Sequence, residues 1–127
     1  MAGSKPRGVT YLSMGAVPVY VGYCPSEKAW IKEMKRLGVK DPPDWVTKGA
    51  SGTMHTFVSE ERMDTCIICV DPVKGRGVEK LGLLVHESTH VVQQIKETMG
   101  EEKWGRETEA YLMQWICQWL FGLVKAK

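Results

Sequence analysis

The sequence predicts an α+β fold in a single domain that spans residues 1–127. Two patterns predict this fold: segments of alternating apolar residues before position 71, and stretches of helical periodicity between and after them. A chain of 127 residues is long enough for one domain with its own core and too short for two. Its 43% apolar and 25% charged residues are typical of a globular protein.

The first elements that we expect are two paired strands. Valine occupies every second position from Val17 to Val21, which predicts a strand with one buried face that reaches Tyr23. The segment from Val9 to Ser13 can pair with it as a hairpin. Because Pro18 has no backbone N–H to donate, we expect this strand at an edge of the sheet.

A helix is expected between Ser26, whose hydroxyl can cap its start, and Gly38, which can end it. The apolar residues of this segment recur at helical spacing and should share one buried stripe. They are Trp30, Ile31, Met34 and Leu37.

The segment from Asp41 to Ser51 is rich in Pro, Gly and Asp and is predicted to be a connecting loop. Within it, Trp45 and Val46 are expected to pack against the core. Strands return after this loop. The segments Thr53 to Val58 and Thr65 to Val70 predict a second hairpin.

Two long helices are expected in the second half of the chain. The first should run from about Val78 to Met99 and end at Gly100, and the second should lie between Glu101 and Val124 with its start delayed by Gly105. The apolar stripes that predict them are Leu81, Val85, Val92, Ile95 and Met99 in the first helix, and Leu112, Trp115, Ile116, Trp119 and Leu123 in the second.

The first of these helices carries the motif HESTH, an instance of HExxH. His86 and His90 are four residues apart, so their side chains lie about 40° apart on one helical face and can bind one metal ion together. Glu87 lies about 60° beyond His90, beside the metal, where its carboxylate can take a proton from a metal-bound water. A tetrahedral catalytic zinc also needs a third protein ligand.

The stretch LVHESTHVVQQ from Leu84 to Gln94, followed by ETEAY from Glu107 to Tyr111, resembles the gluzincin zinc metallopeptidases. The resemblance is strongest to the minimal members found in bacterial and phage genomes. In that family a glutamate on the helix after the HExxH helix is the third zinc ligand. The resemblance therefore implies this role for Glu107, with Glu109 a weaker candidate because it points about 200° away around the helix.

Tyr111 stands where the family often has an aspartate that orients a ligating histidine, so it is a candidate for that supporting role. The resemblance implies a small zincin-like domain: a mainly antiparallel sheet, the HExxH helix packed on it, and a C-terminal ligand helix behind. It further implies one Zn²⁺ per chain and hydrolysis of peptide bonds in a peptide or protein substrate, with Glu87 as general base. The substrate would lie extended beside the hairpin Thr53 to Val70.

Two other functions stay open. Because little of the chain follows the ligand helix, the protein can instead be a catalytically weak or inactive zinc-binding module, with a structural or interaction role in a phage particle or a regulatory complex. A third hypothesis is a processing peptidase that acts on a single partner protein. The alternative without a functional site is that His86 and His90 are ordinary histidines on an exposed helix face, and that Glu87 and Glu107 are solvated carboxylates.

Two further groups are expected to be structural. Cys66 and Cys69 form a C-I-I-C pair, but strand alternation places their sulfurs on opposite faces, which favours buried thiols over a metal or redox site. His55 lies in a predicted strand and could approach a metal or an oxyanion, yet an ordinary surface histidine is the favoured interpretation.

The charge pattern narrows the choice of partners. With a net charge of +2 and interspersed signs, the sequence shows no basic face for nucleic acid. Its apolar stretches are too short or too interrupted for a membrane span, and no secretory signal is evident. We therefore expect a cytoplasmic protein with reduced thiols, in the host cytoplasm or the virion if a phage encodes it.

Overall fold

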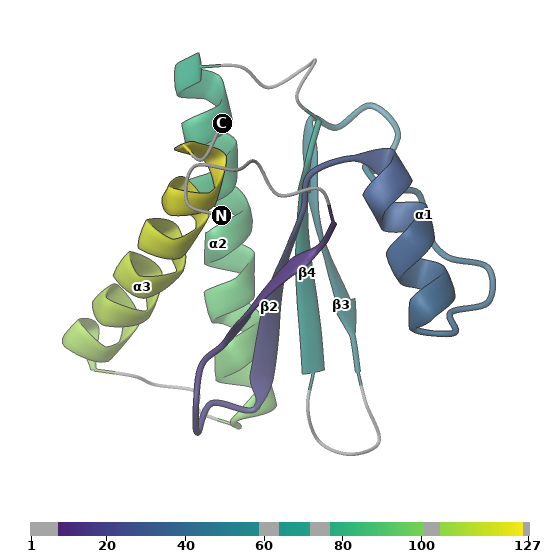
Figure 1. Cartoon of the computed structure of the whole chain (residues 1–127). Helices are drawn as coiled ribbons and strands as arrows, with labels where there is room; N and C mark the ends of the chain where they lie inside the picture. Colours follow the sequence, from purple (N-terminus) through teal and green to yellow (C-terminus); the bar gives the residue numbers. More distant parts are fainter. Residues whose placement is uncertain (1–7, 59–63, 72–76, 101–104, 126–127) are drawn as a thin grey trace.

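A four-stranded mixed sheet forms the middle layer of the fold, with α1 on one face and α2 and α3 on the other (Figure 1). The protein is described here by a computed structural model, which covers residues 8–58, 64–71, 77–100 and 105–125. The elements are β1 (Thr10–Ser13), β2 (Val19–Cys24), α1 (Glu27–Arg36), β3 (Gly52–Phe57), β4 (Asp64–Val70), α2 (Gly77–Thr98) and α3 (Arg106–Lys125). This architecture confirms the predicted α+β class.

The strand order is β1-β2-β4-β3, with antiparallel pairs at both edges and a parallel pair, β2 with β4, in the centre. The edge position expected for the strand containing Pro18 is therefore wrong. β2 begins after Pro18, at Val19, so the missing N–H falls outside the ladder, and the Pro18 carbonyl accepts a hydrogen bond from the Asp64 N–H at 3.1 Å. Both predicted hairpins are present.

Each face of the sheet carries its own apolar core, because side chains alternate along the strands. Cys66 and Ile68 point toward α2 and α3, whereas Ile67 and Cys69 point toward α1. The opposite orientation of Cys66 and Cys69 confirms the prediction of two buried thiols that do not act together. The larger core also contains Val19, Val21, Tyr23, Leu84, Val91, Ile95, Ile116 and Leu120.

α1 begins and ends where its sequence predicts. The Ser26 hydroxyl accepts a hydrogen bond from the Ala29 N–H at 3.1 Å, and Gly38 adopts a φ of +71° just past the last turn. Its buried stripe is narrower than expected. Trp30 and Met34 are buried, but Ile31 is exposed and faces away from the sheet.

α2 has the expected length but a different buried face. Leu84, Ser88, Val91 and Ile95 lie against the sheet, at the spacing of a helical stripe. The expected stripe is wrong in three of its members, because Leu81, Val85 and Met99 are exposed. In the described part of the chain, no helix combines the length and apolar character that crossing a membrane requires.

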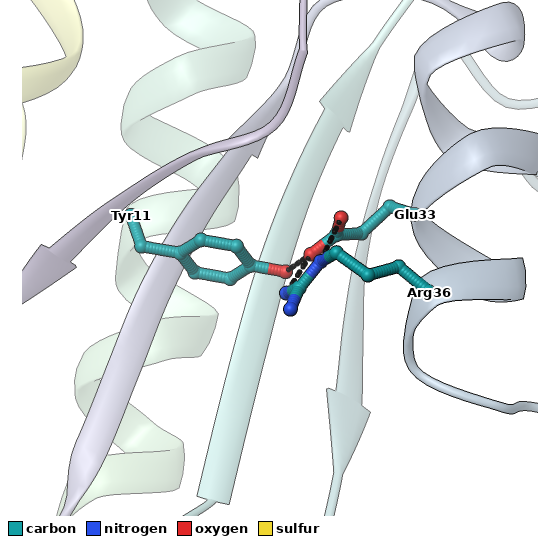
Figure 2. A network of polar contacts seen from close by, with 3 residues as sticks. All are labelled: Tyr11, Glu33 and Arg36. Carbon is teal, nitrogen blue, oxygen red and sulfur yellow. Dashed lines mark hydrogen bonds and ion pairs between the residues drawn. The ribbon is translucent and has the colours of Figure 1, made fainter.

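A polar network links β1 to α1 across β2, as Figure 2 shows. The Tyr11 hydroxyl donates a hydrogen bond to the buried carboxylate of Glu33, which also accepts two from the guanidinium of Arg36, at 2.7 Å and 2.5 Å. The Tyr11 ring crosses directly over Gly22, where an added Cβ would lie 2.8 Å from the Tyr11 Cε1 atom. Gly22 thus makes room for the contact.

Candidate metal centre

One turn of α2 brings together the three residues of the HExxH motif. Ligand atoms of His86, Glu87 and His90 all lie within 4.8 Å of one another. The two imidazole rings meet nearly edge to face, with centroids 4.9 Å apart and an interplanar angle of 82°. Two imidazoles and a carboxylate are donors that suit zinc and similar divalent metals, so this group could hold a metal ion.

The residues between the histidines explain the direction in which they point. Ser88 is fully buried and donates a hydrogen bond to the Leu84 carbonyl at 2.6 Å, which satisfies its hydroxyl against the sheet. At about 100° per residue, His86 and His90 each lie roughly 160° around the helix from Ser88, in opposite directions. Both therefore lie on the outer face of the helix. Both histidines are accordingly exposed.

Glu87 lies between the buried stripe and the histidine face and is only 4% exposed. Its carboxylate faces the start of β3, where an added Cβ on Gly52 would stand 3.4 Å from Glu87 Oε2. Burial raises the pKa of Glu87, opposed by the charges of His86, His90 and His55 and by a hydrogen bond from the Met54 backbone N–H. A carboxyl whose pKa is raised by burial is suited to proton transfer near neutral pH.

An open cleft of about 530 Å³ lies beside the group, between the first half of α2 and the residues that lead into β3. Small residues form one wall, and His86 and Glu87 belong to the opposite wall. A ligand in this cleft would therefore contact the motif directly. The cleft is lined by Ala50, Ser51, Gly52, Glu79, Gly82, Leu83, His86 and Glu87.

His90 has a polar neighbour on its own helix. Its Nδ1 atom lies 3.0 Å from the amide Oε1 of Gln93, one turn further along. Residues three apart lie on neighbouring positions of a helix surface, so the spacing of His90 and Gln93 carried a signal for this contact. Gln93 was nevertheless not among the predicted site residues.

Glu107 and Tyr111 both lie in the first two turns of α3 and are exposed. The metal-binding group found in the described part of the chain does not include Glu107. Glu107 is on α3, whereas the three residues of the group are all on α2. The third-ligand role of Glu107 and the supporting role of Tyr111 stay predictions.

His55 belongs to the other face of the sheet. It pairs in register with Ile67, stacks on Trp30 with ring centroids 4.4 Å apart, and places its Nε2 atom 2.9 Å from the Trp45 carbonyl oxygen. The favoured interpretation, in which His55 is not a site residue, agrees with this position, although His55 is half-buried rather than a free surface residue.

Gly52 and Met54 are contacts of Glu87 that the sequence analysis missed, since no local pattern links β3 to a helix that starts 25 residues later.

Comparison of the chain with protein-family models, with curated proteins and with solved structures found no match. The resemblance to gluzincins therefore depends on the motif residues themselves, and the geometry of His86, Glu87 and His90 carries the functional argument.

Proposed function

We propose that this protein is a zinc-dependent metallopeptidase that hydrolyses peptide bonds with Glu87 as its general base. One observation carries the proposal: ligand atoms of His86, Glu87 and His90 lie within 4.8 Å of one another at the wall of an open cleft. The different burial of the three residues supports different roles. The exposed histidines would bind the metal, and the buried carboxylate would transfer protons.

In this proposal His86 and His90 would hold the ion through ring nitrogens, and Glu107 would be the third protein ligand. A bound zinc supplies Lewis acidity and lowers the pKa of a water molecule in the cleft. Glu87 accepts a proton from that water and returns it to the departing amine. The Met54 N–H and the wall at Gly52 hold the Glu87 carboxylate in place for both transfers.

The substrate is proposed to lie along β3. Among the residues that the structure describes, this strand pairs with β4 alone, so its other edge has backbone groups that an extended peptide can pair with. The first residue of β3, Gly52, lines the cleft together with Glu87. A peptide added to this edge would thus approach the proposed general base.

A second candidate function is a zinc-binding module with a structural or interaction role, such as in a phage particle or a regulatory complex. The position of Glu107 favours it, because that residue lies outside the group formed by His86, Glu87 and His90. Two exposed histidines on one helix turn can bind zinc without a third protein ligand, and metal binding then stabilises the fold instead of serving catalysis.

The deciding experiment measures zinc per chain and peptide hydrolysis for the wild type and for His86→Ala, Glu87→Gln and Glu107→Ala. Glu109→Ala is the matched control, an exposed glutamate on the same helix turn. A peptidase should bind about one zinc, lose it in His86→Ala, and lose turnover with zinc retained in Glu87→Gln. Zinc binding with no turnover on any peptide in a broad library would favour the structural module. Full zinc occupancy in His86→Ala would refute both.

A further inference from the structure

We propose that Gln93 is a positioning residue for the candidate metal centre: it holds the imidazole proton of His90 on Nδ1 and so directs the lone pair of Nε2 outward, toward a metal. This inference rests on the proposed metal site. It names Gln93 as the residue that sets the tautomer of the ligand His90 in the metal-free protein.

The side chains of His90 and Gln93 are in direct contact. His90 Nδ1 lies 3.0 Å from Gln93 Oε1, a normal distance for an N–H···O hydrogen bond. An amide oxygen can only accept a hydrogen bond, so the imidazole nitrogen must donate. A neutral imidazole carries a single ring proton. With that proton on Nδ1, the lone pair available to a metal is on Nε2.

Metal-binding histidines commonly donate the N–H of the other ring nitrogen to an acceptor, which fixes the tautomer and the ring orientation. Gln93 provides such an acceptor from the same helix, at a spacing that needs no tertiary structure. Gln93 is exposed, so the apolar core does not require its side chain. The contact with His90 is therefore the interaction that places this side chain.

The other two histidines make the inference specific to His90. His86 makes an edge-to-face contact with the His90 ring. In the described part of the chain, its ring nitrogens have no hydrogen bond to a side-chain acceptor like the one between His90 and Gln93. His55 places Nε2, not Nδ1, against the Trp45 carbonyl, so its proton belongs on Nε2. His55 and His90 should thus be opposite tautomers in the same molecule.

The first test reads the tautomer directly in the metal-free protein. Two-bond ¹H–¹⁵N NMR spectra of the ring nitrogens, recorded in the presence of a chelator above about pH 8 where imidazoles are neutral, distinguish the two tautomers. With three histidines in the chain, assignment is simple, and His55 is an internal reference. We expect the Nδ1–H form for His90 and the Nε2–H form for His55. An Nε2–H form for His90 in the wild type would overturn the proposal.

The second test uses variants of Gln93. Gln93→Met keeps the length and helix preference of the side chain but removes the acceptor, whereas Gln93→Glu retains an acceptor. Gln114→Met is the matched control, since Gln114 is also an exposed glutamine in a helix. We expect Gln93→Met to lose the preference for Nδ1–H at His90 and to bind zinc about tenfold more weakly, with Gln93→Glu restoring both properties. An unchanged zinc affinity in Gln93→Met would contradict the proposal.

The two tests separate this inference from the proposed function. If the wild type binds no zinc but His90 is the Nδ1–H tautomer and loses this preference in Gln93→Met, the positioning contact stands and the metal site fails. If zinc binds normally while the His90 tautomer is the same in wild type and Gln93→Met, the metal site stands and the role of Gln93 is refuted.

Discussion

Gly52, the first residue of the edge strand β3, lies directly against the Glu87 carboxylate of α2. A Cβ atom added to Gly52 would stand 3.4 Å from Glu87 Oε2 and 3.3 Å from the carbonyl oxygen of Cys69. The carboxylate thus lies between a helix and a strand, within contact distance of Gly52 and hydrogen-bonded by the Met54 backbone N–H.

Gly52→Val should therefore displace Glu87. The branched side chain would need the space of the carboxylate, and we expect a loss of about 1–3 kcal/mol in the free energy of unfolding. If Glu87 is the general base, turnover should fall by more than zinc affinity does, because the atoms nearest to an added Gly52 Cβ include Glu87 Oε2 and no histidine atom. Urea unfolding, zinc titration and peptide hydrolysis measure the three effects. Wild-type stability and turnover in this variant would show that the Glu87 carboxylate does not depend on Gly52.

The network of Tyr11, Glu33 and Arg36 predicts a pH-dependent contribution to stability. Hydrogen bonds from Arg36 lower the pKa of Glu33, helped by the Tyr11 hydroxyl and opposed by burial. A lowered pKa in the folded state means that the charged carboxylate stabilises the fold above its unfolded pKa, near 4.5, and that this stability is lost as the pH falls through the folded value.

Glu33→Gln should accordingly destabilise the protein by about 1–3 kcal/mol at pH 7, by breaking a buried hydrogen-bond network. The difference from the wild type should narrow as the pH falls below about 4.5, where the Glu33 carboxyl of the unfolded chain becomes protonated, and should be smallest once the folded carboxylate is protonated too. Urea unfolding between pH 7 and pH 3 measures both effects. Glu27→Gln, an exposed glutamate on the same helix, is the control. A difference that stays constant over this pH range would rule out the ionic role of Glu33.

The cysteines should divide into one reactive and three protected thiols. Cys24, Cys66 and Cys69 are fully buried, whereas Cys117 is partly exposed. Burial also raises the pKa of Cys66 to about 11, so little thiolate forms there at neutral pH. A thiol reagent should label one cysteine quickly in the native protein and the other three only after unfolding. Cys117→Ser should remove the fast reaction, and a second fast thiol would contradict the core assignment.

Gly122→Ala should stabilise the protein. Gly122 lies inside α3 and is exposed, and a Cβ added there meets no atom within 4 Å. Alanine in a helix interior is favoured over glycine by about 0.5–1 kcal/mol, which should raise Tm by a few degrees. Thermal unfolding measures the gain. A lower Tm would show that the surface around Gly122 is occupied in the folded protein.

Local sequence signals predicted most of the elements, because they depend on neighbouring residues. Ser26 and Gly38 set the ends of α1, and the HESTH segment was placed correctly on a long helix. Long-range pairing was not predictable in this way. The assignment of the Pro18 segment to an edge failed because β2 pairs on its second side with β4, a partner that no nearby residue specifies.

The candidate site was likewise predictable where it depends on neighbouring residues and not where it depends on long-range packing. His86, Glu87 and His90 lie on one turn, so helix geometry alone brings them together. The wall that buries Glu87 comes from β3, and only the tertiary packing of α2 on the sheet creates it. The error in the buried stripe of α2 has a related cause: apolar residues surround much of this helix, and periodicity alone did not decide between Leu84 and Val85 as the sheet-facing residue.

The central parallel pair also has a consequence for how the chain folds. β2 and β4 are separated by the whole of α1 and β3, so the sheet can close only after β4 inserts between β2 and β3. Pairing between distant segments slows folding relative to local hairpins. During synthesis, β2 and β3 emerge before the strand that joins them, and both have unpaired edges until it arrives. The HExxH helix emerges last of these, so it gains its supporting sheet only once β4 is in place.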